Sequence, residues 1–444
     1  MIPGPRKLII EVTSRCNLDC PMCLRWQIPQ QGDMEPETFS RLRPLFPEAE
    51  SIVLTGYGES LLHPHILEMV RKAREALPAA GRVSLITNGA LLEPSLAREL
   101  VSAGLDDLGV SLDGATPETY RAVRPEGDLS AAVGGLEAIA AAKGHLGRAN
   151  PRLSVHFVAM RRNLAELPRL VDLARESGAQ AVVVSHLLPH TEALSHQVVY
   201  GHHSDASLDH FARLVRDAAG AGVDLSPVLE FVPYIYNLAG LPPLRNPAPP
   251  NLDWLRGLPS GKRLALEMVA ECLGRAAREK VALHLAKLMA GEGLPWDGAA
   301  DIFAEASRRA EARGIALTLP PLSPRAGREC GFMRDGAAFI TREGAMSPCQ
   351  NLSHSYQCYL NGRLKSLTHV SFGNVREQEA REIWESTGYQ AFRALALRFD
   401  FPPCGDCGYS EGCSLVRVAE FQNDCYFHVQ PCGDCPWSRG LLQC

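Results

Sequence analysis

Three cysteines near the start of the chain have a spacing that suits a catalytic metal site. The pattern Cys16-x3-Cys20-x2-Cys23 follows a short apolar segment, Leu8–Glu11. Three thiolates this close in sequence can surround one face of an iron–sulfur cluster and leave one iron without a protein ligand. Catalysis at a metal requires such an open position, whereas structural sites are closed. A three-cysteine zinc knuckle or unrelated buried thiols are the alternatives. We predict a catalytic iron–sulfur cluster here.

The remaining cysteines are concentrated at the other end of the chain. Of 14 cysteines, three lie within residues 16–23, Cys272 stands alone, and ten fall between Cys330 and Cys444. A secreted disulfide framework typically forms a small domain behind a signal peptide, and the opening residues contain no long apolar stretch. The lack of such a stretch argues against a secretory signal, so we expect a cytoplasmic protein. In that reducing compartment, dense cysteines indicate metal thiolates. Cys272 lies in a helical pattern and is expected to be a buried core thiol.

The composition argues against several kinds of partner. Hydrophobic residues make up 46% and charged residues 21% of the 444 residues, as in an ordinary globular protein. The formal net charge of −5 gives no electrostatic reason to expect binding to nucleic acid or to an anionic membrane. No window approaches the roughly 20 uninterrupted apolar residues of a membrane span. We therefore expect no nucleic-acid partner and no membrane partner.

The first part of the chain alternates between strand-like and helix-like segments. The strand candidates are short and rich in Val, Ile or Leu, as expected for parallel strands buried on both faces. They are Leu8–Glu11, Ser51–Leu54, Arg82–Thr87, Asp107–Leu112, Leu153–Ala159 and Ala181–Ser185. Helical patterns lie between them, near residues 35–45, 64–76, 91–103, 129–143 and 165–177. Six such repeats predict a parallel α/β sheet, either an open barrel or doubly wound, and periodicity alone does not choose.

The rest of the chain has a different character. Helices are predicted over residues 206–222, 261–292 and 299–313, with a Pro-, Gly- and Asn-rich connector over 239–260. From Cys330 onward, short strands, turns and cysteines replace the helical pattern, so metal is expected to stabilise this region as much as an apolar core does. The expected domains are a barrel over 1–200, a helical insertion or linker over 201–325, and a small cysteine-rich metal-cluster domain over 326–444.

The cysteine motif, its place after the first strand and the six α/β units resemble the radical S-adenosylmethionine (SAM) superfamily over roughly residues 5–190. This resemblance implies an enzyme with a partial (β/α)6 TIM-like barrel and a [4Fe–4S] cluster on Cys16, Cys20 and Cys23. In that family the open iron chelates the amino and carboxylate groups of SAM. One electron then splits SAM into methionine and a 5′-deoxyadenosyl radical, which abstracts hydrogen from the substrate. A low-potential donor such as ferredoxin or flavodoxin is the implied electron source.

Other segments resemble the SAM-binding positions of the family. Thr55-Gly56-Tyr57-Gly58-Glu59 is similar to the glycine–glutamate motif that receives the amino group of SAM, which implicates Gly58 and Glu59. By the same resemblance, Ser111 and Asp113 are candidates for contacts to the ribose or the carboxylate, and Asn88 for a neighbouring contact. The alternative is that Asn88-Gly89 and Asp113-Gly114 simply form turns.

The match to the family is partial at several positions. Tyr57 replaces a glycine, Ser60 replaces a proline, and Met22 occupies a position that is often aromatic. Arg161 and Arg162, after the fifth strand, are candidates for the SAM carboxylate or simply a solvated surface pair.

The C-terminal cysteines resemble the SPASM extension of radical SAM enzymes, which carries auxiliary [4Fe–4S] clusters. The spacing is Cys330-x13-Gly344-x4-Cys349, then Cys404-x2-Cys407-x5-Cys413. The family pattern places another cysteine three residues later, whereas this chain has none until Cys425. We predict one or two auxiliary clusters, and zinc is the competing metal. The predicted ligands are Cys330, Cys349, Cys404, Cys407, Cys413, Cys425, Cys432, Cys435 and Cys444.

A narrower resemblance covers nearly the whole C-terminal region. Its elements are Cys349–Tyr356, Ser371–Val375, Ile383-Trp384, Phe399–Cys404, Asn423–Cys425 and Cys432–Trp437. Together they are similar to the radical SAM maturases associated with tungsten-containing aldehyde ferredoxin oxidoreductases. The resemblance implies action on a tungsten- or molybdenum-pterin cofactor or its host oxidoreductase, which would then be a partner. His354 is a candidate metal ligand or proton donor, or a hydrogen-bonded structural histidine.

Two other functions stay open. A peptide- or protein-modifying SPASM enzyme, which oxidises or crosslinks side chains, would be marked by an N-terminal peptide-recognition module, and the first predicted strand already begins at Leu8. A non-catalytic iron–sulfur electron carrier has no need of a SAM-binding rim, so the Gly58-Glu59 and Ser111–Asp113 elements count against it.

Overall fold

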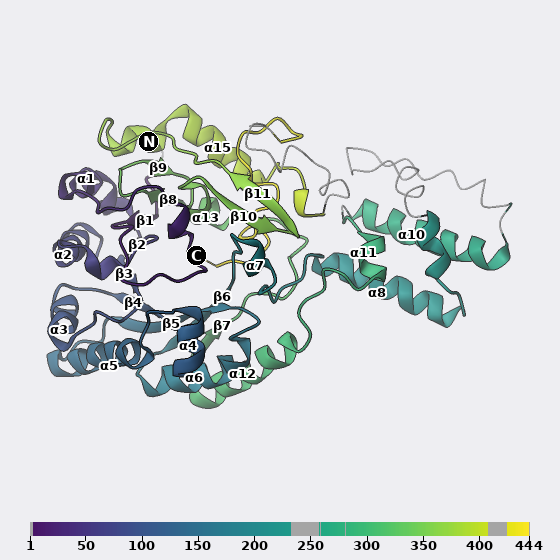
Figure 1. Ribbon diagram of the computed structural model, residues 1–444. Helices are drawn as coiled ribbons and strands as arrows, with labels where there is room; N and C mark the ends of the chain where they lie inside the picture. The colour runs from purple at the N-terminus through teal and green to yellow at the C-terminus, as the bar shows by residue number, and fades with distance from the viewer. Residues whose placement is uncertain (1–2, 232–256, 258, 280, 407–423, 444) are drawn as a thin grey trace.

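A curved, mostly parallel sheet wrapped by helices forms the main body of the protein (Figure 1). The computed structural model describes residues 3–231, 257, 259–279, 281–406 and 424–443. The six predicted strands lie side by side in chain order and run parallel. They are β1 (Lys7–Glu11), β2 (Ser51–Thr55), β3 (Arg82–Thr87), β4 (Asp107–Ser111), β5 (Arg152–Ala159) and β6 (Ala181–His186). The predicted partial barrel is confirmed.

Helices cover the outer face of this sheet. They are α1 (Pro36–Ser40), α2 (Ile66–Ala76), α3 (Pro94–Ser102), α4 (Pro117–Val123), α5 (Leu129–Leu146) and α6 (Leu167–Glu176). Pro94 occupies the first turn of α3, where its missing N–H costs nothing. The helix expected over 35–45 is shorter, because Pro44 and Pro47 fall in a 3-10 segment, Arg43–Glu48, that follows α1.

The sequence suggested strands buried on both faces, but three of the strands differ from this expectation. In β2, β3 and β6, buried residues alternate with half-buried ones. The half-buried set faces the barrel interior, where Thr55, Ile86 and Ser185 line a cavity. The outward set packs beneath the helices in one continuous core that includes Leu54, Leu85 and Val184. The alternation therefore reflects a hollow barrel mouth.

Three more strands from later in the chain extend the sheet. β7 (Ala316–Thr318) pairs with β6, and β8 (Ala337–Ile340) pairs in parallel with β1. β9 (Met346–Ser347) runs antiparallel to β8. α12 (Ala299–Arg313) packs on α6, where Asp172 pairs with Arg309 and Arg313 at 2.7 Å each. The sheet thus draws strands from all three expected domains, and the boundaries at 200 and 325 stay a prediction.

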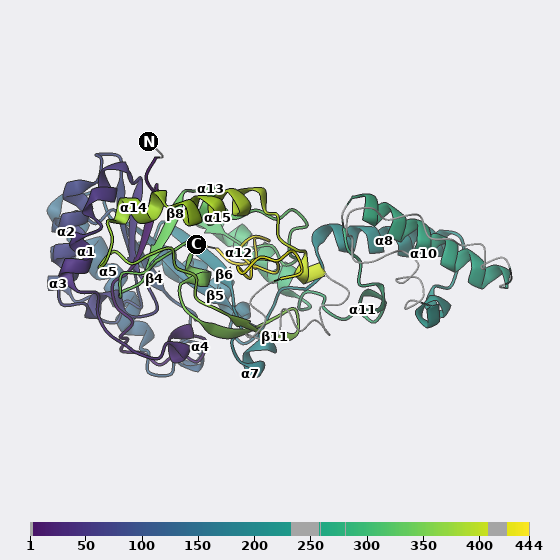
Figure 2. The ribbon, with the colours of Figure 1, turned by 90° about the horizontal axis from the view of Figure 1, so that it is seen from above.

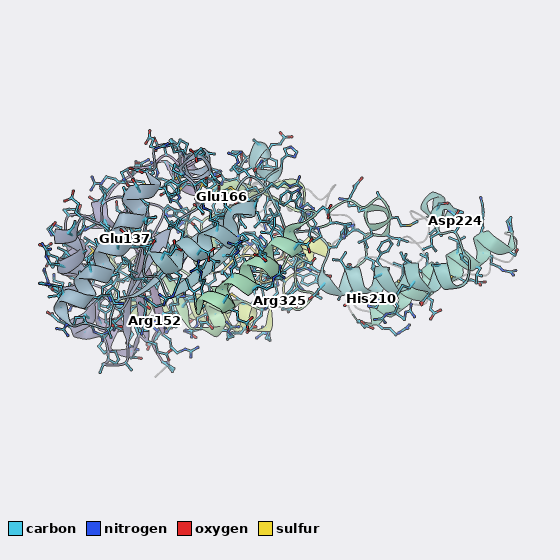
Figure 3. All side chains as sticks on the ribbon, turned by 90° about the horizontal axis from the view of Figure 1, so that it is seen from below. Glu137, Arg152, Glu166, His210, Asp224 and Arg325 are labelled. Carbon is cyan, nitrogen blue, oxygen red and sulfur yellow. The ribbon has the colours of Figure 1, made fainter. Side chains whose placement is uncertain are left out.

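A helical arm projects from the barrel in every view (Figures 1 and 2). It contains α8 (Asp205–Gly220), α10 (Ser260–Arg278) and α11 (Leu285–Met289), and Figure 3 labels His210 on α8. The single helix expected over 261–292 is divided, because the turn after α10 brings Leu283 and Leu285 into the arm's own apolar core. Cys272 is 1% exposed in that core. The predicted connector over 239–260 lies largely outside the described residues.

The C-terminal region packs against the open side of the barrel. Its hairpin joins β10 (Tyr356–Leu360) to β11 (Arg363–Leu367) through Asn361-Gly362, both with positive φ, as a tight two-residue hairpin turn requires. Helices α13 (Gly331–Arg334), α14 (Ala380–Glu385) and α15 (Thr387–Arg398) complete it. Among the described residues, no helix is both long and apolar enough to cross a membrane.

Candidate active site

The cysteine loop is anchored by the ends of β1 and β2. Arg15 pairs with Asp33 at 2.6 Å, and the backbone oxygen of Arg15 accepts the N–H of Glu59 at 2.8 Å. Within the loop, the Cys23 N–H donates to the Cys20 oxygen at 3.0 Å and closes a turn. The loop that carries the three cysteines is therefore tied to the segment that follows β2.

All three thiols border one cavity of ≈ 340 Å³ at the carboxyl ends of the strands. This end of a parallel barrel is where active sites form. Four of the five predicted SAM-contact residues also line the cavity: Gly58, Glu59, Asn88 and Ser111. The fifth, Asp113, does not. Tyr57 and Met22, where the sequence departs from the family pattern, both border the cavity.

Gly58 lets two loops come unusually close. A Cβ at this position would lie 2.5 Å from the backbone oxygens of both Thr13 and Arg15. Because these atoms are backbone, they cannot rotate away as a side chain would. Only glycine fits, so the loop after β2 can pack directly against the loop after β1.

Glu59 is a buried carboxylate that joins neighbouring strand ends. It is 2% exposed and accepts hydrogen bonds from the Thr87 hydroxyl and the Asn88 N–H, each at 2.7 Å. Burial raises the pKa of Glu59, against the effect of these hydrogen bonds. The Asn88 side chain in turn donates to Asn17 of the cysteine loop at 2.8 Å. A cationic amine bound in the cavity would place an opposite charge beside this buried carboxylate and so favour its ionised form.

Asp113 lies behind the cavity wall rather than in it. Asp113 is fully buried, its Oδ2 pairs with Arg124 at 2.6 Å, and its Oδ1 accepts the Val158 N–H at 2.7 Å. Arg124 does line the cavity, and its Nη1 stands 3.9 Å from Cys20 Sγ. Sequence reasoning missed Arg124, which no motif marks. Its guanidinium is a natural counter-charge for a thiolate at Cys20.

The three thiols fit metal ligation rather than a free-thiol role. Burial raises the pKa of Cys20 to about 11, although Arg124 lowers it, and burial also raises the pKa of Cys16 and Cys23. Unligated, these thiols would stay neutral, whereas a metal holds them as thiolates. The described residues contain no group of three or more His, Cys, Asp or Glu side chains that could hold a single metal ion. Cysteines around a multi-iron cluster each bind a different iron and so stand farther apart.

The C-terminal region supplies the opposite wall of the cavity. Gln350, Trp437, Leu442 and Gln443 all border it. These residues lie about 290 positions or more beyond Gly58, and no local pattern in the sequence places them at the site. Arg161 and Arg162 do not border the cavity. Arg161 Nε donates to the Val198 oxygen, and Arg162 donates to Gln197 and the Ala122 oxygen.

Tyr57 connects the two walls. Its backbone oxygen lies 3.9 Å from Cys23 Sγ, and its hydroxyl donates to the Gln350 oxygen at 3.2 Å. His354 stands edge-on to the Tyr57 ring at 5.5 Å and bonds through Nε2 to buried Glu11 at 3.0 Å. His354 is thus a hydrogen-bonded histidine at the joint between the two regions.

Four of the predicted C-terminal ligands lie close together. Burial and the nearby thiols of Cys330, Cys432 and Cys435 raise the pKa of Cys349 well above its usual value, so these four form one group. Cys404 Sγ lies against the backbone of Gly433, the residue after Cys432, and Cys425 is also near Cys404. Cys407, Cys413 and Cys444 lie outside the described residues. Cys358, which was not predicted as a ligand, is fully buried on β10.

Comparison with known proteins agrees with this geometry. Residues 10–174 match the model of the radical SAM superfamily, and residues 330–408 match the SPASM iron–sulfur cluster-binding domain. This chain is a radical SAM enzyme with a SPASM domain. Its cofactors are SAM, a [4Fe–4S] cluster in the radical SAM domain, and auxiliary iron–sulfur clusters in the SPASM domain.

Two relatives match the radical SAM enzyme over almost its whole length. One is the tungsten-containing aldehyde ferredoxin oxidoreductase cofactor-modifying protein of Pyrococcus furiosus, 26% identical over 98% of this chain and 96% of the relative. The other is the AdoMet-dependent heme synthase of Methanosarcina barkeri, 25% identical over 95% and 93%. Among solved structures, SuiB of Streptococcus suis bound to SAM is 12% identical, with a TM-score of 0.47 over 93% of this chain and 72% of that chain.

Proposed function

We propose that this radical SAM enzyme matures a tungsten- or molybdenum-pterin cofactor or the oxidoreductase that hosts it. The observation that carries the proposal is the match to the Pyrococcus furiosus cofactor-modifying protein, which spans 98% of the chain. That match includes the C-terminal region that forms the second wall of the cavity. A low-potential ferredoxin or flavodoxin and a cytoplasmic location belong to the same proposal.

Each side of the cavity has a separate task in this proposal. Cys16, Cys20 and Cys23 hold the cluster, and Arg124 balances their charge. Gly58, Glu59, Asn88 and Ser111 bind SAM, with Glu59 receiving its amino group. When bound, the cluster and SAM supply the one-electron chemistry that removes a hydrogen atom from the substrate. Asp113 acts through Arg124, which it orients.

The substrate side favours an anionic molecule. A larger cavity of ≈ 710 Å³ shares Trp437, Leu442 and Gln443 with the inner one. Its four cationic side chains are Lys7, Arg325, Arg328 and Arg334, and its three carboxylates are Asp205, Glu329 and Asp335. Arg334 pairs with both Glu329 and Asp335, and the lining as a whole carries one more cation than carboxylate. A cavity of this size, with an indole at its inner end, suits a phosphate-bearing heterocycle such as a pterin cofactor.

The test uses the anaerobically reconstituted full chain with dithionite, SAM and a tungsten-pterin oxidoreductase produced without this enzyme. We expect 5′-deoxyadenosine formation to rise when the oxidoreductase is added. We also expect a mass change in the released pterin or the host chain, and a Cys20→Ala control without either effect. Deoxyadenosine formation that the oxidoreductase does not stimulate, with no mass change, would contradict the proposed substrate while leaving the radical SAM assignment intact.

A further inference from the structure

Three charged side chains are buried together in the C-terminal region. Arg363 and Lys365 on β11 are 5% and 2% exposed, and Asp434 is 4% exposed. Arg363 Nη2 lies 2.8 Å from Asp434 Oδ2, and Lys365 Nζ contacts Asp434 Oδ1. Lys365 also donates to the Pro431 oxygen at 2.9 Å. We call these three residues the buried triad.

The triad has one more positive than negative charge. Among the described residues, Asp434 is the carboxylate that pairs with both cations. The other partners of the cations are neutral backbone oxygens, those of Pro431 and Cys404, and Arg363 Nε has no partner within the described structure. A buried charge without an opposite charge nearby is strongly destabilising. An excess cation at this depth therefore indicates an anion in the assembled protein.

Cysteines lie beside the triad. Arg363 Nη2 donates to the backbone oxygen of Cys404 at 3.3 Å. A Cβ on Gly433 would lie 2.7 Å from Cys404 Sγ, so this sulfur rests against the backbone next to Asp434. Asp434 itself stands between Cys432 and Cys435 of the four-cysteine group. The triad therefore lies beside Cys404 and beside the segment that carries Cys432 and Cys435.

We propose that Arg363, Lys365 and Asp434 form the counter-charge of the auxiliary metal–thiolate site at Cys404 and set its reduction potential. A [4Fe–4S] cluster with four thiolate ligands has a net negative charge, and one more after reduction. A buried excess of positive charge stabilises the reduced form and so raises the potential. The triad residues are positioning groups and do not bind the metal. The proposal depends on the auxiliary clusters and not on the substrate, so it stands or falls independently of the proposed function.

The test measures the midpoint potential of the auxiliary cluster signal that Cys404→Ala removes. The full chain is reconstituted anaerobically, with Cys16, Cys20 and Cys23 replaced by Ala so that the SAM-binding cluster adds no signal. Potentiometric titration is followed by electron paramagnetic resonance. Lys365→Met removes a positive charge, and we expect a lower potential. Asp434→Asn removes the negative charge, and we expect a higher one.

Two controls separate charge from packing. Lys365→Arg keeps the charge and should keep both the potential and the iron content. Lys72→Met removes a surface lysine that pairs with Glu68 on α2, and it should change neither. Shifts of the same sign in Lys365→Met and Asp434→Asn, or no shift in either, overturn the proposal. Iron lost from Lys365→Met but kept by Lys365→Arg supports it, whereas equal loss from both shows a packing role and overturns it.

Discussion

Replacing Asp113 with Asn distinguishes a SAM contact from a structural counter-ion. Family resemblance makes Asp113 a SAM-contact candidate, whereas the structure buries it completely against Arg124. The amide can still accept the Val158 N–H, so the variant mainly removes the negative charge. The variant leaves the charge of Arg124 without this carboxylate partner, on a side chain that is only 11% exposed.

The magnitude follows from the geometry of this pair. Removing one partner of a buried ion pair costs about 3–5 kcal/mol, because the other charge stays buried without compensation. Arg124 borders a cavity, so water can reach part of it, and we expect the lower end, about 3 kcal/mol. At a urea dependence of about 3 kcal/mol per M, the unfolding midpoint should fall by about 1 M. The double variant Asp113→Asn/Arg124→Gln removes both charges and should recover about 2 kcal/mol.

The assay follows urea unfolding by far-UV circular dichroism and SAM binding by equilibrium dialysis, both anaerobically. Midpoints are compared rather than absolute free energies, because a chain of 444 residues is not expected to unfold in one step. If Asp113→Asn keeps the wild-type midpoint and loses SAM affinity, Asp113 contacts SAM directly and the counter-ion argument is wrong.

Three further predictions concern the cavity and its pH dependence. Cys20→Ala should abolish 5′-deoxyadenosine formation and leave the far-UV circular dichroism spectrum nearly unchanged; residual product after full reconstitution would contradict the cluster assignment. Gly58→Ala should cost about 1–3 kcal/mol in unfolding free energy and weaken SAM binding at least tenfold, because its Cβ would lie 2.5 Å from two backbone oxygens. The control Gly134→Ala on α5, where an added Cβ would meet nothing within 4 Å, should have neither effect. Burial lowers the pKa of His186 to about 4, although the Pro321 oxygen raises it, so the unfolded chain takes up the proton first as pH falls. Unfolding free energy should therefore drop by up to roughly 3 kcal/mol between pH 6.5 and 4; His186→Gln should flatten this slope in urea titrations, and an unchanged slope would refute the assignment.

The sequence predicts the barrel well because its signal is periodic and repeated. Six apolar strands separated by helices define both the layer order and the edge where the polar residues gather, so Gly58, Glu59, Asn88 and Ser111 lie near the three cysteines as expected. The short strands β7, β8 and β9 have two to four residues each and no detectable period. Their pairing depends on partners far away in the chain.

The missed parts of the site have a common physical origin. Arg124 is held at the cavity by its ion pair with Asp113. The spacing of residues in the sequence does not reveal such a pairing between side chains. Gln350, Trp437 and Gln443 reach it through packing of the C-terminal region against the barrel. The cysteine ligands, in contrast, are close together in sequence because one loop must surround one cluster.

The pairing of β8 with β1 has a consequence for how the protein is made. Lys7 pairs with Ala337, so the first strand of the barrel meets its second neighbour only after 330 further residues have been synthesised. At roughly 5–20 residues per second, this takes about 15–65 s on the ribosome. During that interval the apolar edge of β1 is unpaired and can join another strand. Truncation before β8 would make this exposure permanent, so the radical SAM region is expected to aggregate when it is produced without the C-terminal region.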